Sequence, residues 1–321
     1  MQNNDYLCKD YNLKGEMNYK KIIKSGAMRQ KILKFLSFVP DKPMLKMQYR
    51  LKLGRWPDFK SPRRYTEKIQ VYKMYYRNPV VGTCSDKYEV RQYLEKKGYG
   101  WMFPALYGVY DKAEDIDFDK LPERFVIKTN DGGGGDNVII CKDKSKLDIP
   151  QTIKDLNSWL NKKDINGGRE WGYSLIKKSV IIIEEYLEDK EHPDKSIDDF
   201  KFFCFDGEIF CVQHDTGRYT DNHTRNFYDQ EWNDLHVKMI KDNSKTPAPI
   251  PDNFEEMKTV VRKLSKDFPH VRVDLYSVNG KIYFGEFTFY TGAGYSKCEP
   301  DSFDLTMGEA FDISSFMPKN K

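Results

Sequence analysis

Two stretches of the sequence carry side chains that could handle phosphate groups and a metal ion. In the first, an apolar run from Phe125 to Ile127 ends at Lys128, and four glycines follow at positions 132 to 135. A loop without side chains lets backbone N–H groups approach phosphate oxygens, and a nearby lysine supplies positive charge. The spacing fits neither a P-loop nor a dinucleotide-binding motif. A glycine-rich structural hairpin is an equal alternative to a phosphate-binding loop.

The second stretch is a pair of predicted strands with charged residues on one face. Arg272 and Asp274 lie two residues apart on the first strand, and Glu286 and Thr288 on the second. Side chains two apart share a face, and cross-strand pairing brings the two sets together. Carboxylate oxygens on adjacent strands are ligands that Mg²⁺ accepts, especially when substrate phosphates complete its shell. The alternative is an ordinary hairpin whose charges face solvent.

The elements that would position these residues follow from periodicity and turn signals. Three hairpins are predicted, over 125–140 around the glycines, over 200–213 with a turn at Asp206-Gly207, and over 271–289 with a turn at Asn279-Gly280. A buried strand is predicted over 180–186, and helices over 62–78, 85–98, 151–162 and 252–266. Ser85 is the expected N-cap of the second helix, and Gly98 its stop. Antiparallel strands with flanking helices indicate an α+β fold.

Composition narrows the class of protein. A chain of 321 residues predicts about two domains, and 14% aromatic residues exclude global disorder. Six cysteines without a CxxC pair, and no apolar signal peptide, predict a reduced cytoplasmic compartment. No apolar run approaches the ~20 residues of a membrane span.

The basic charge is concentrated at one end of the chain. Residues 1–80 hold 19 Lys and Arg against 6 Asp and Glu, whereas the remainder holds 34 against 43. Residues 15–38 read as a basic amphipathic helix. Such a helix either packs on its own domain or contacts an anionic membrane surface. Nucleic-acid binding is not expected, because no recognised RNA- or DNA-binding motif accompanies the basic residues.

Six short segments in a fixed order carry a family resemblance. They are Asp86-Lys87, Phe125-Val126-Ile127-Lys128 with its glycines, Ile183-Glu184-Glu185-Tyr186-Leu187, Asp199-Phe200-Lys201, Arg272-Val273-Asp274 and Glu286-Phe287-Thr288. This order resembles the ATP-grasp superfamily, and residues 62–308 resemble its TupA-like proteins, which are associated with the biosynthesis of teichuronopeptide and other surface polysaccharides.

The resemblance implies a role for each matching residue. For ATP, it implies phosphate-binding lysines at Lys87 and Lys128, a mobile loop at Gly132, Gly133, Gly134 and Gly135, an adenine hinge at Glu184, Glu185, Tyr186 and Leu187, and a ribose-binding acid at Asp199. For catalysis, it implies Lys201 and Arg225 near the transferred phosphoryl group, Arg272 beside the intermediate, and Mg²⁺ on Asp274 and Glu286. Thr288 departs from the family pattern, which has Asn there, and its hydroxyl is expected to be a poorer metal ligand.

The same resemblance implies an architecture and an activity. The expected fold is an α+β ATP-grasp fold with a basic helical N-terminal extension. The expected regions are that extension (1–61), an N-terminal subdomain (62–121), a lid with the glycine loop (122–190) and a C-terminal subdomain with the metal hairpin (191–321). The implied activity is an ATP-dependent carboxylate–amine ligase that joins an amino acid to a uronic acid through an acyl phosphate. A sugar kinase and a non-catalytic nucleotide-binding module are the alternatives.

The histidines show no metal spacing and no link to a nucleophile, so structural or surface roles are expected for them. One polar stretch, 215–229, is a further candidate. Its Arg218 and His223 could line a pocket for an acceptor substrate or a phosphate group.

Overall fold

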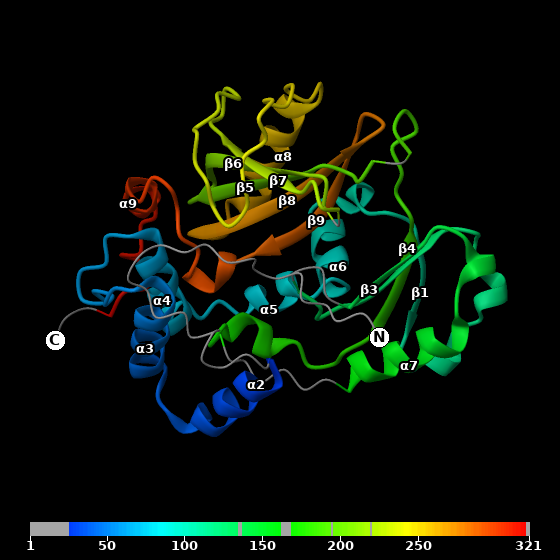
Figure 1. Cartoon of the computed structure of the whole chain (residues 1–321), viewed down its shortest axis with the longest axis horizontal. Helices are drawn as coiled ribbons and strands as arrows, with labels where there is room; N and C mark the ends of the chain where they lie inside the picture. The colour runs from blue at the N-terminus through cyan, green and yellow to red at the C-terminus, as the bar shows by residue number, and fades with distance from the viewer. Residues whose placement is uncertain (1–25, 134–136, 162–167, 194, 219, 319–321) are drawn as a thin grey trace.

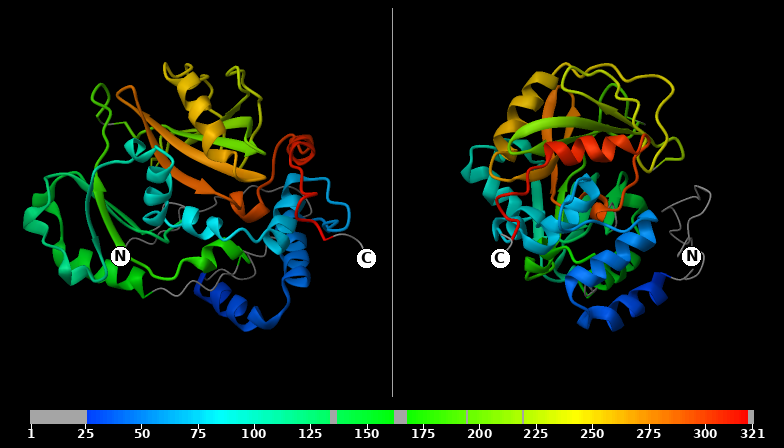
Figure 2. Two further views of the ribbon diagram at one scale, coloured as in Figure 1. Left: turned by 180° about the vertical axis from the view of Figure 1, so that it is seen from behind. Right: turned by 90° about the vertical axis from the view of Figure 1, so that its left-hand side faces the viewer.

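The computed structural model describes residues 26–133, 137–161, 168–193, 195–218 and 220–318. Two antiparallel sheets dominate this part of the chain, and helices lie against and between them (Figures 1 and 2). Within the described residues, no helix is both long enough and apolar enough to cross a bilayer.

The smaller sheet carries the predicted glycine hairpin. It has the order β1-β4-β2-β3, formed by Leu106–Tyr110, Ile181–Glu185, Phe125–Thr129 and Val138–Cys141. Helix α7 (Ile149–Leu160) packs on one face. The buried side chains Phe125, Ile127 and Leu156 lie in the core between them. Strand β1 belongs to this sheet although it precedes residue 122, where the lid was predicted to begin. The predicted subdomain boundaries stay predictions.

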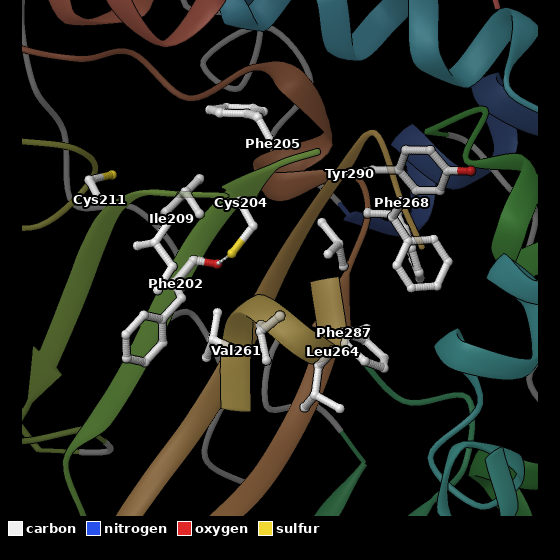
Figure 3. Close-up of a cluster of buried hydrophobic side chains, with 14 of the residues drawn as sticks. Phe202, Cys204, Phe205, Ile209, Cys211, Val261, Leu264, Phe268, Phe287 and Tyr290 are labelled. Carbon is white, nitrogen blue, oxygen red and sulfur yellow. Dashed lines mark hydrogen bonds between the residues drawn. The ribbon is translucent and has the colours of Figure 1, made fainter. Parts of the chain in front are cut away.

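The larger sheet carries the predicted metal hairpin. Its order is β7-β6-β5-β8-β9, formed by Thr224–Tyr228, Glu208–Thr216, Asp199–Phe205, His270–Val278 and Lys281–Thr288. Helix α8 (Phe254–Ser265) covers its back, where Phe202, Val261, Leu264 and Phe287 form part of the core (Figure 3). The opposite face is polar over part of its length, because Asp199 and Lys201 alternate with the core residues of β5.

The remaining helices connect and flank the sheets. They are α2 (Gly26–Phe35), α3 (Asp41–Leu53), α4 (Tyr65–Tyr75), α5 (Val80–Ser85), α6 (Glu89–Lys96) and α9 (Ser302–Ala310). Short 3-10 turns are η1 (Leu36–Phe38), η2 (Gly100–Met102), η3 (Ala113–Asp115), η4 (Phe118–Lys120), η5 (Lys144–Lys146), η6 (Trp171–Leu175) and η7 (Thr291–Gly294). Thr66 of α4 donates from its backbone N–H and its hydroxyl to Asp304 of α9, which fixes the two helices together.

All three hairpins are confirmed, and so is the α+β class. The Asn279-Gly280 turn has φ of 53° and 75°, the left-handed values that favour these residues. The predicted helix caps differ in one place. Asp86, not Ser85, accepts from the backbone N–H groups of Tyr88 and Glu89, because Ser85 is already the last residue of α5. Of the predicted basic helix 15–38, residues 15–25 lie outside the described part.

Candidate nucleotide and metal site

A row of polar side chains crosses the open face of the larger sheet. In the strand register, Lys201 on β5 faces Gln213 on β6 and Asp274 on β8. Asp274 in turn faces Glu286 on β9. Antiparallel pairing therefore brings together residues that are up to 85 positions apart in the sequence.

Asp274 is the buried centre of this row. Arg272 donates to both of its carboxylate oxygens, from Nε and Nη2 at 2.7 Å each, and Lys201 Nζ donates to Oδ2 at 2.6 Å. Burial raises the pKa of Asp274, whereas Arg272 and Lys201 oppose that rise. A buried carboxylate with two cationic partners has the compensation that such a charge needs.

Glu286 is the accessible member of the row, with 37% of its side chain exposed. Its Oε1 lies 3.5 Å from Arg272 Nη2, and its Oε2 lies 4.0 Å from Lys87 Nζ on the other side of the cleft. Burial alone would raise the pKa of Glu286, but Lys87 and Arg272, helped by Lys201 and Arg218, lower it. Thr288 Oγ1 accepts from Arg272 Nη2 at 2.9 Å and lies 3.3 Å from Glu286 Oε1. Its hydroxyl is therefore part of the cluster.

A β-bulge at Gly285 sets the direction of Glu286. Asp274 pairs with Glu286 while its neighbour Leu275 pairs with Phe284, so Gly285 is the extra residue. The bulge lets Phe284 and Phe287, three residues apart, both be buried at under 5% exposure. A Cβ at Gly285 would lie 3.0 Å from the Asp274 carbonyl oxygen and 3.2 Å from the Tyr276 ring. Strict two-residue alternation, used in the sequence prediction, does not reveal this bulge.

Lys128 and Glu184 meet on the smaller sheet, in a cleft between the two sheets. Lys128 Nζ donates to Glu184 Oε1, and Arg91 Nη1 lies 3.4 Å from Glu184 Oε2. The Arg91 guanidinium also donates to the Pro104 carbonyl and lies over the Phe103 ring at 4.6 Å. The cleft encloses about 250 Å³ and is also lined by Lys87, Val90, Phe284 and Gly285. This is below the ~300–1,000 Å³ of most ligand pockets, because the paired charges fill it.

Lys87 lies beside the start of the glycine loop. Its Nζ donates to the Gly132 carbonyl, and its backbone N–H donates to the Asn130 carbonyl at 3.0 Å. Asn130 also donates to Asp86 Oδ2 at 2.6 Å, so the segment before α6 is held against the glycine hairpin. Gly133 has open space around its Cβ position. Gly134 and Gly135 lie outside the described residues.

The predicted hinge runs from β4 toward β5. Glu185 Oε2 accepts from the Ala105 N–H at 3.2 Å, and the Tyr186 ring lies near the cationic groups of Arg124 and Lys142, at 5.9 and 5.8 Å. Leu187 is half-buried.

Asn279, at the tip of the metal hairpin, fastens the end of this hinge. Its Oδ1 accepts from the Lys190 N–H, and its Nδ2 donates to the Glu188 carbonyl, both at 2.9 Å.

Arg225 is not brought into the cluster around Asp274. Its guanidinium makes a two-point contact with Asp215, at 2.6 and 2.9 Å, and also donates to the Met239 carbonyl. Asp199 instead receives Lys201, at 2.5 Å, and Arg218. Of the two basic residues in this stretch, Arg218 is thus the one joined to the row. The ribose-binding role of Asp199 and the phosphoryl-binding role of Arg225 stay predictions.

The loop after β9 is held by two side chains of α4. Lys73 Nζ and Gln70 Nε2 donate to the Ala293 carbonyl of η7, at 2.6 and 3.0 Å. Lys73 also donates to the Gly168 carbonyl at 2.9 Å. Burial lowers the pKa of Lys73 to about 7. These contacts fix the backbone that follows Thr288.

Residues 67–312 match the TupA-like ATPgrasp family, and this span covers more than half of the chain. The chain belongs to the TupA-like ATP-grasp family. Its two sheets and the cleft between them form the ATP-grasp fold.

Solved structures similar to this ATP-grasp protein include three enzymes described as ligases or synthetases. One is D-alanine–D-alanine ligase from Bacillus anthracis complexed with ATP (18% identity, TM-score 0.41, 64% of this chain and 55% of that one). The others are D-cycloserine synthetase DcsG (15%, 0.37, 73% and 72%) and the ATP-grasp ligase PsnB with minimal precursor, Mg and ADP (12%, 0.35, 92% and 75%). The chain spans only about half the length of the first of these. A search among curated proteins gave no match.

Two residues of this ATP-grasp cleft were missed by the sequence prediction. Arg91 is a single arginine on a predicted helix, and no local pattern marks it. Gly285 is a single glycine within a strand, and such a glycine is a known sign of a bulge. That signal could have been used.

The carboxylates fit a metal that arrives with its substrate. Among the described residues, no group of three or more His, Cys, Asp or Glu side chains comes together as a metal site. Mg²⁺ bound to nucleotides commonly needs only one or two protein carboxylates, because phosphates and water complete its shell. Asp274 and Glu286, opposite each other in the register, meet that requirement.

Proposed function

We propose that this protein is an ATP-dependent carboxylate–amine ligase that works through an acyl phosphate. The observation that carries the proposal is the row Lys201–Asp274–Glu286, with Arg272 beside it and Lys87 reaching it from across the cleft. The row combines carboxylates for a metal with several cations for transferred phosphate, as the family assignment leads us to expect.

The reaction proceeds in two transfers. A substrate carboxylate oxygen attacks the γ-phosphorus of ATP, the bond from that phosphorus to the β–γ bridging oxygen breaks, and ADP leaves. The amine nitrogen then attacks the acyl carbon, its proton is lost, and inorganic phosphate leaves, so that an amide remains. The protein forms no covalent bond in either step, and positioning and charge stabilisation carry the rate.

The cations have separate parts in this proposal. Lys87 and Lys128 hold the phosphates of ATP, together with backbone N–H groups of the loop that begins at Gly132. Arg272 and Lys201, both within 2.7 Å of Asp274, stabilise the negative charge that develops on the transferred phosphoryl group. Arg225 takes a supporting position, because Asp215 already holds its guanidinium.

Asp274 and Glu286 would hold Mg²⁺, with the Thr288 hydroxyl beside them. When bound, Mg²⁺ supplies positive charge to the β- and γ-phosphate oxygens. Glu286 is suited to meet it first, because it is the more exposed of the two carboxylates.

The nucleotide base is assigned to the cleft that ends at the hinge. Glu184, now paired with Lys128 and Arg91, would accept from the adenine amino group, and the backbone from Glu185 to Leu187 would pair with the ring edge. Asp199 is proposed as the ribose contact. Nucleotide entry then requires that the charge pairs in the cleft open.

The substrate class follows from the family. TupA-like proteins are associated with surface polysaccharides, so we assign a uronic acid of a glycan or its precursor as the carboxylate and an amino acid as the amine. The reaction would take place in the cytoplasm.

A release screen for ADP tests this function. Purified protein with Mg²⁺ and ATP is incubated with uronic acids, free or nucleotide-linked, each combined with a panel of amino acids, and products are analysed by mass. ADP release that needs both partners, with free phosphate and an amide product, is the expected result. A stable phosphoester without an amine requirement would instead identify a kinase. ATP binding without turnover in any combination would identify a non-catalytic nucleotide-binding module.

A further inference from the structure

The N-terminal helix of the described chain exposes its large apolar side chains. Phe35 and Phe38 are 76% and 75% exposed, and Met28 is 54% exposed. The two rings meet edge to face, with centroids 6.2 Å apart. Helix α2 lies at the margin of the molecule, away from both sheets (Figures 1 and 2). Water-exposed phenylalanines are costly, so this placement calls for an explanation.

The neighbouring helix adds to this exposed apolar area. Met47 and Leu51, one turn apart on α3, are each 40% exposed, and Trp56 just beyond is 67% exposed. The described chain has twelve exposed large hydrophobic residues, and six of them fall within residues 28–56. The concentration is too high for the single scattered residues that occur on any protein surface.

The charge of the same region has one sign. Residues 26–56 contain eight Lys and Arg but one acidic residue, Asp41. Arg169 Nη1 pairs with that carboxylate at 2.9 Å, and Arg169 Nη2 donates to the Leu36 carbonyl at 3.1 Å. Lys31 and Lys34 on α2 are exposed, and so are Lys42, Lys46 and Arg50 on α3. The acidic group is thus neutralised within the protein, and the basic groups face outward.

We propose that α2, η1 and the outward residues of α3 form a docking surface for an anionic lipid bilayer. Aromatic rings suit the interface between headgroups and acyl chains, and lysines can extend their charges to lipid phosphates while their stems stay apolar. Each basic residue near an anionic surface adds to the attraction. A neutral protein partner would satisfy the apolar side chains but not the surrounding positive charge. The surface does not depend on the ligase activity.

Vesicle co-sedimentation of the full chain tests the proposal. Vesicles of phosphatidylcholine alone are compared with vesicles that contain 30–40% phosphatidylglycerol, at low and high salt, where about tenfold stronger binding to the anionic vesicles at low salt is expected. The double variant Phe35→Ser/Phe38→Ser and the double variant Lys31→Glu/Lys34→Glu should each weaken that binding at least about tenfold.

Matched controls lie on the opposite side of the molecule. Ile240 and Ile250 are each 51% exposed, in the segment between β7 and α8, and Lys263 and Lys266 are exposed on or beside α8. Ile240→Ser/Ile250→Ser and Lys263→Glu/Lys266→Glu should bind vesicles as the native chain does. Equal losses in test and control variants, or equal binding to both vesicle types, would overturn the proposal.

Light scattering on the same samples separates the other occupants. A native dimer that Phe35→Ser/Phe38→Ser converts to a monomer would show that a second copy covers this face, and the lipid assignment would be wrong. A large drop in melting temperature in this variant would show that the rings pack within the chain, which would also overturn the proposal. Unchanged mass and melting temperature, with lost vesicle binding, support it.

Discussion

Glu286 faces Asp274 across the metal hairpin and remains partly open to the cleft. We expect Glu286→Gln to reduce ADP formation at least about 100-fold, because the amide removes the negative charge that a metal requires. The melting temperature should change little, since the side chain is not buried. Glu123→Gln, at an exposed position away from the cleft, serves as the matched control. Turnover at the native rate in Glu286→Gln would rule out the metal assignment.

Gly285 tests whether the bulge directs this carboxylate. In Gly285→Ala, the new Cβ would crowd the Asp274 carbonyl and the Tyr276 ring, so the strand must shift by a few tenths of an ångström. We expect a several-fold higher Mg²⁺ concentration at half-maximal ADP formation. Gly98→Ala, at a left-handed helix end with φ of 83°, should lower stability without that change. An equal effect of the two variants on Mg²⁺ dependence would show that the bulge has no special role.

At the scale of single residues, the sequence predicted those whose neighbours are local. Asp274, Glu286 and Arg272 follow from strand alternation and the Asn279-Gly280 turn. Arg218 and Arg225 were not separable in this way, because their partners Asp199 and Asp215 lie on strands whose register is set by long-range pairing. Which arginine joins the row depends on tertiary structure.

Between elements, Asn279 links the metal hairpin to the hinge through two hydrogen bonds. Asn279→Gly keeps the left-handed turn but removes both bonds, so we expect a several-fold weaker affinity for ATP, given about 0.5–1.5 kcal/mol for each bond. Asn279→Asp retains the acceptor for the Lys190 N–H and should have an intermediate effect. Isothermal titration with a non-hydrolysable ATP analogue measures both. Native affinity in Asn279→Gly would show that the hinge needs no such anchor.

The elements differ in how well their own residues define them. Each predicted hairpin has a two-residue turn or a glycine loop that fixes it locally. Strands β1 and β7 and helix α9 were not predicted, since short edge elements depend on what they pack against. Helix α3 was missed because Pro43 was read as a stop, whereas proline is tolerated in the first helical turn.

For the molecule as a whole, His270 ties stability to pH. Its Nδ1 donates to the Cys204 carbonyl at 3.0 Å, which leaves Nε2 to accept from the Tyr65 hydroxyl at 3.0 Å. Burial lowers the pKa of His270 to about 3, whereas the unfolded chain takes up this proton near pH 6.5. Between these values the unfolded state binds more protons, so the free energy of unfolding should fall as pH falls.

Urea unfolding from pH 6.5 to 3.5 measures this dependence. The His270 contribution should approach about 1.4 kcal/mol per pH unit below its unfolded pKa. His270→Gln keeps hydrogen-bonding groups but cannot titrate, and its stability should fall less steeply over the same range. Identical slopes for the two proteins would contradict the assignment of a neutral buried ring.

The arrangement of the whole molecule could be predicted only through family resemblance. The ordered motifs gave the ATP-grasp fold, and the family match over residues 67–312 confirms it. The charge pairs that fill the cleft could not be predicted, because Lys128, Glu184 and Arg91 come from separate elements and meet only after the sheets and α6 pack.

The pair formed by Lys128 and Glu184 has a consequence for turnover. When a phosphate group leaves Lys128, the lysine returns to a carboxylate already within reach, so its charge is not left unpaired in a partly buried cleft. The same exchange is available to Lys87 with the Gly132 carbonyl and Glu286. Departure of a spent nucleotide therefore has internal replacements waiting for each cation, which favours release of product over its retention.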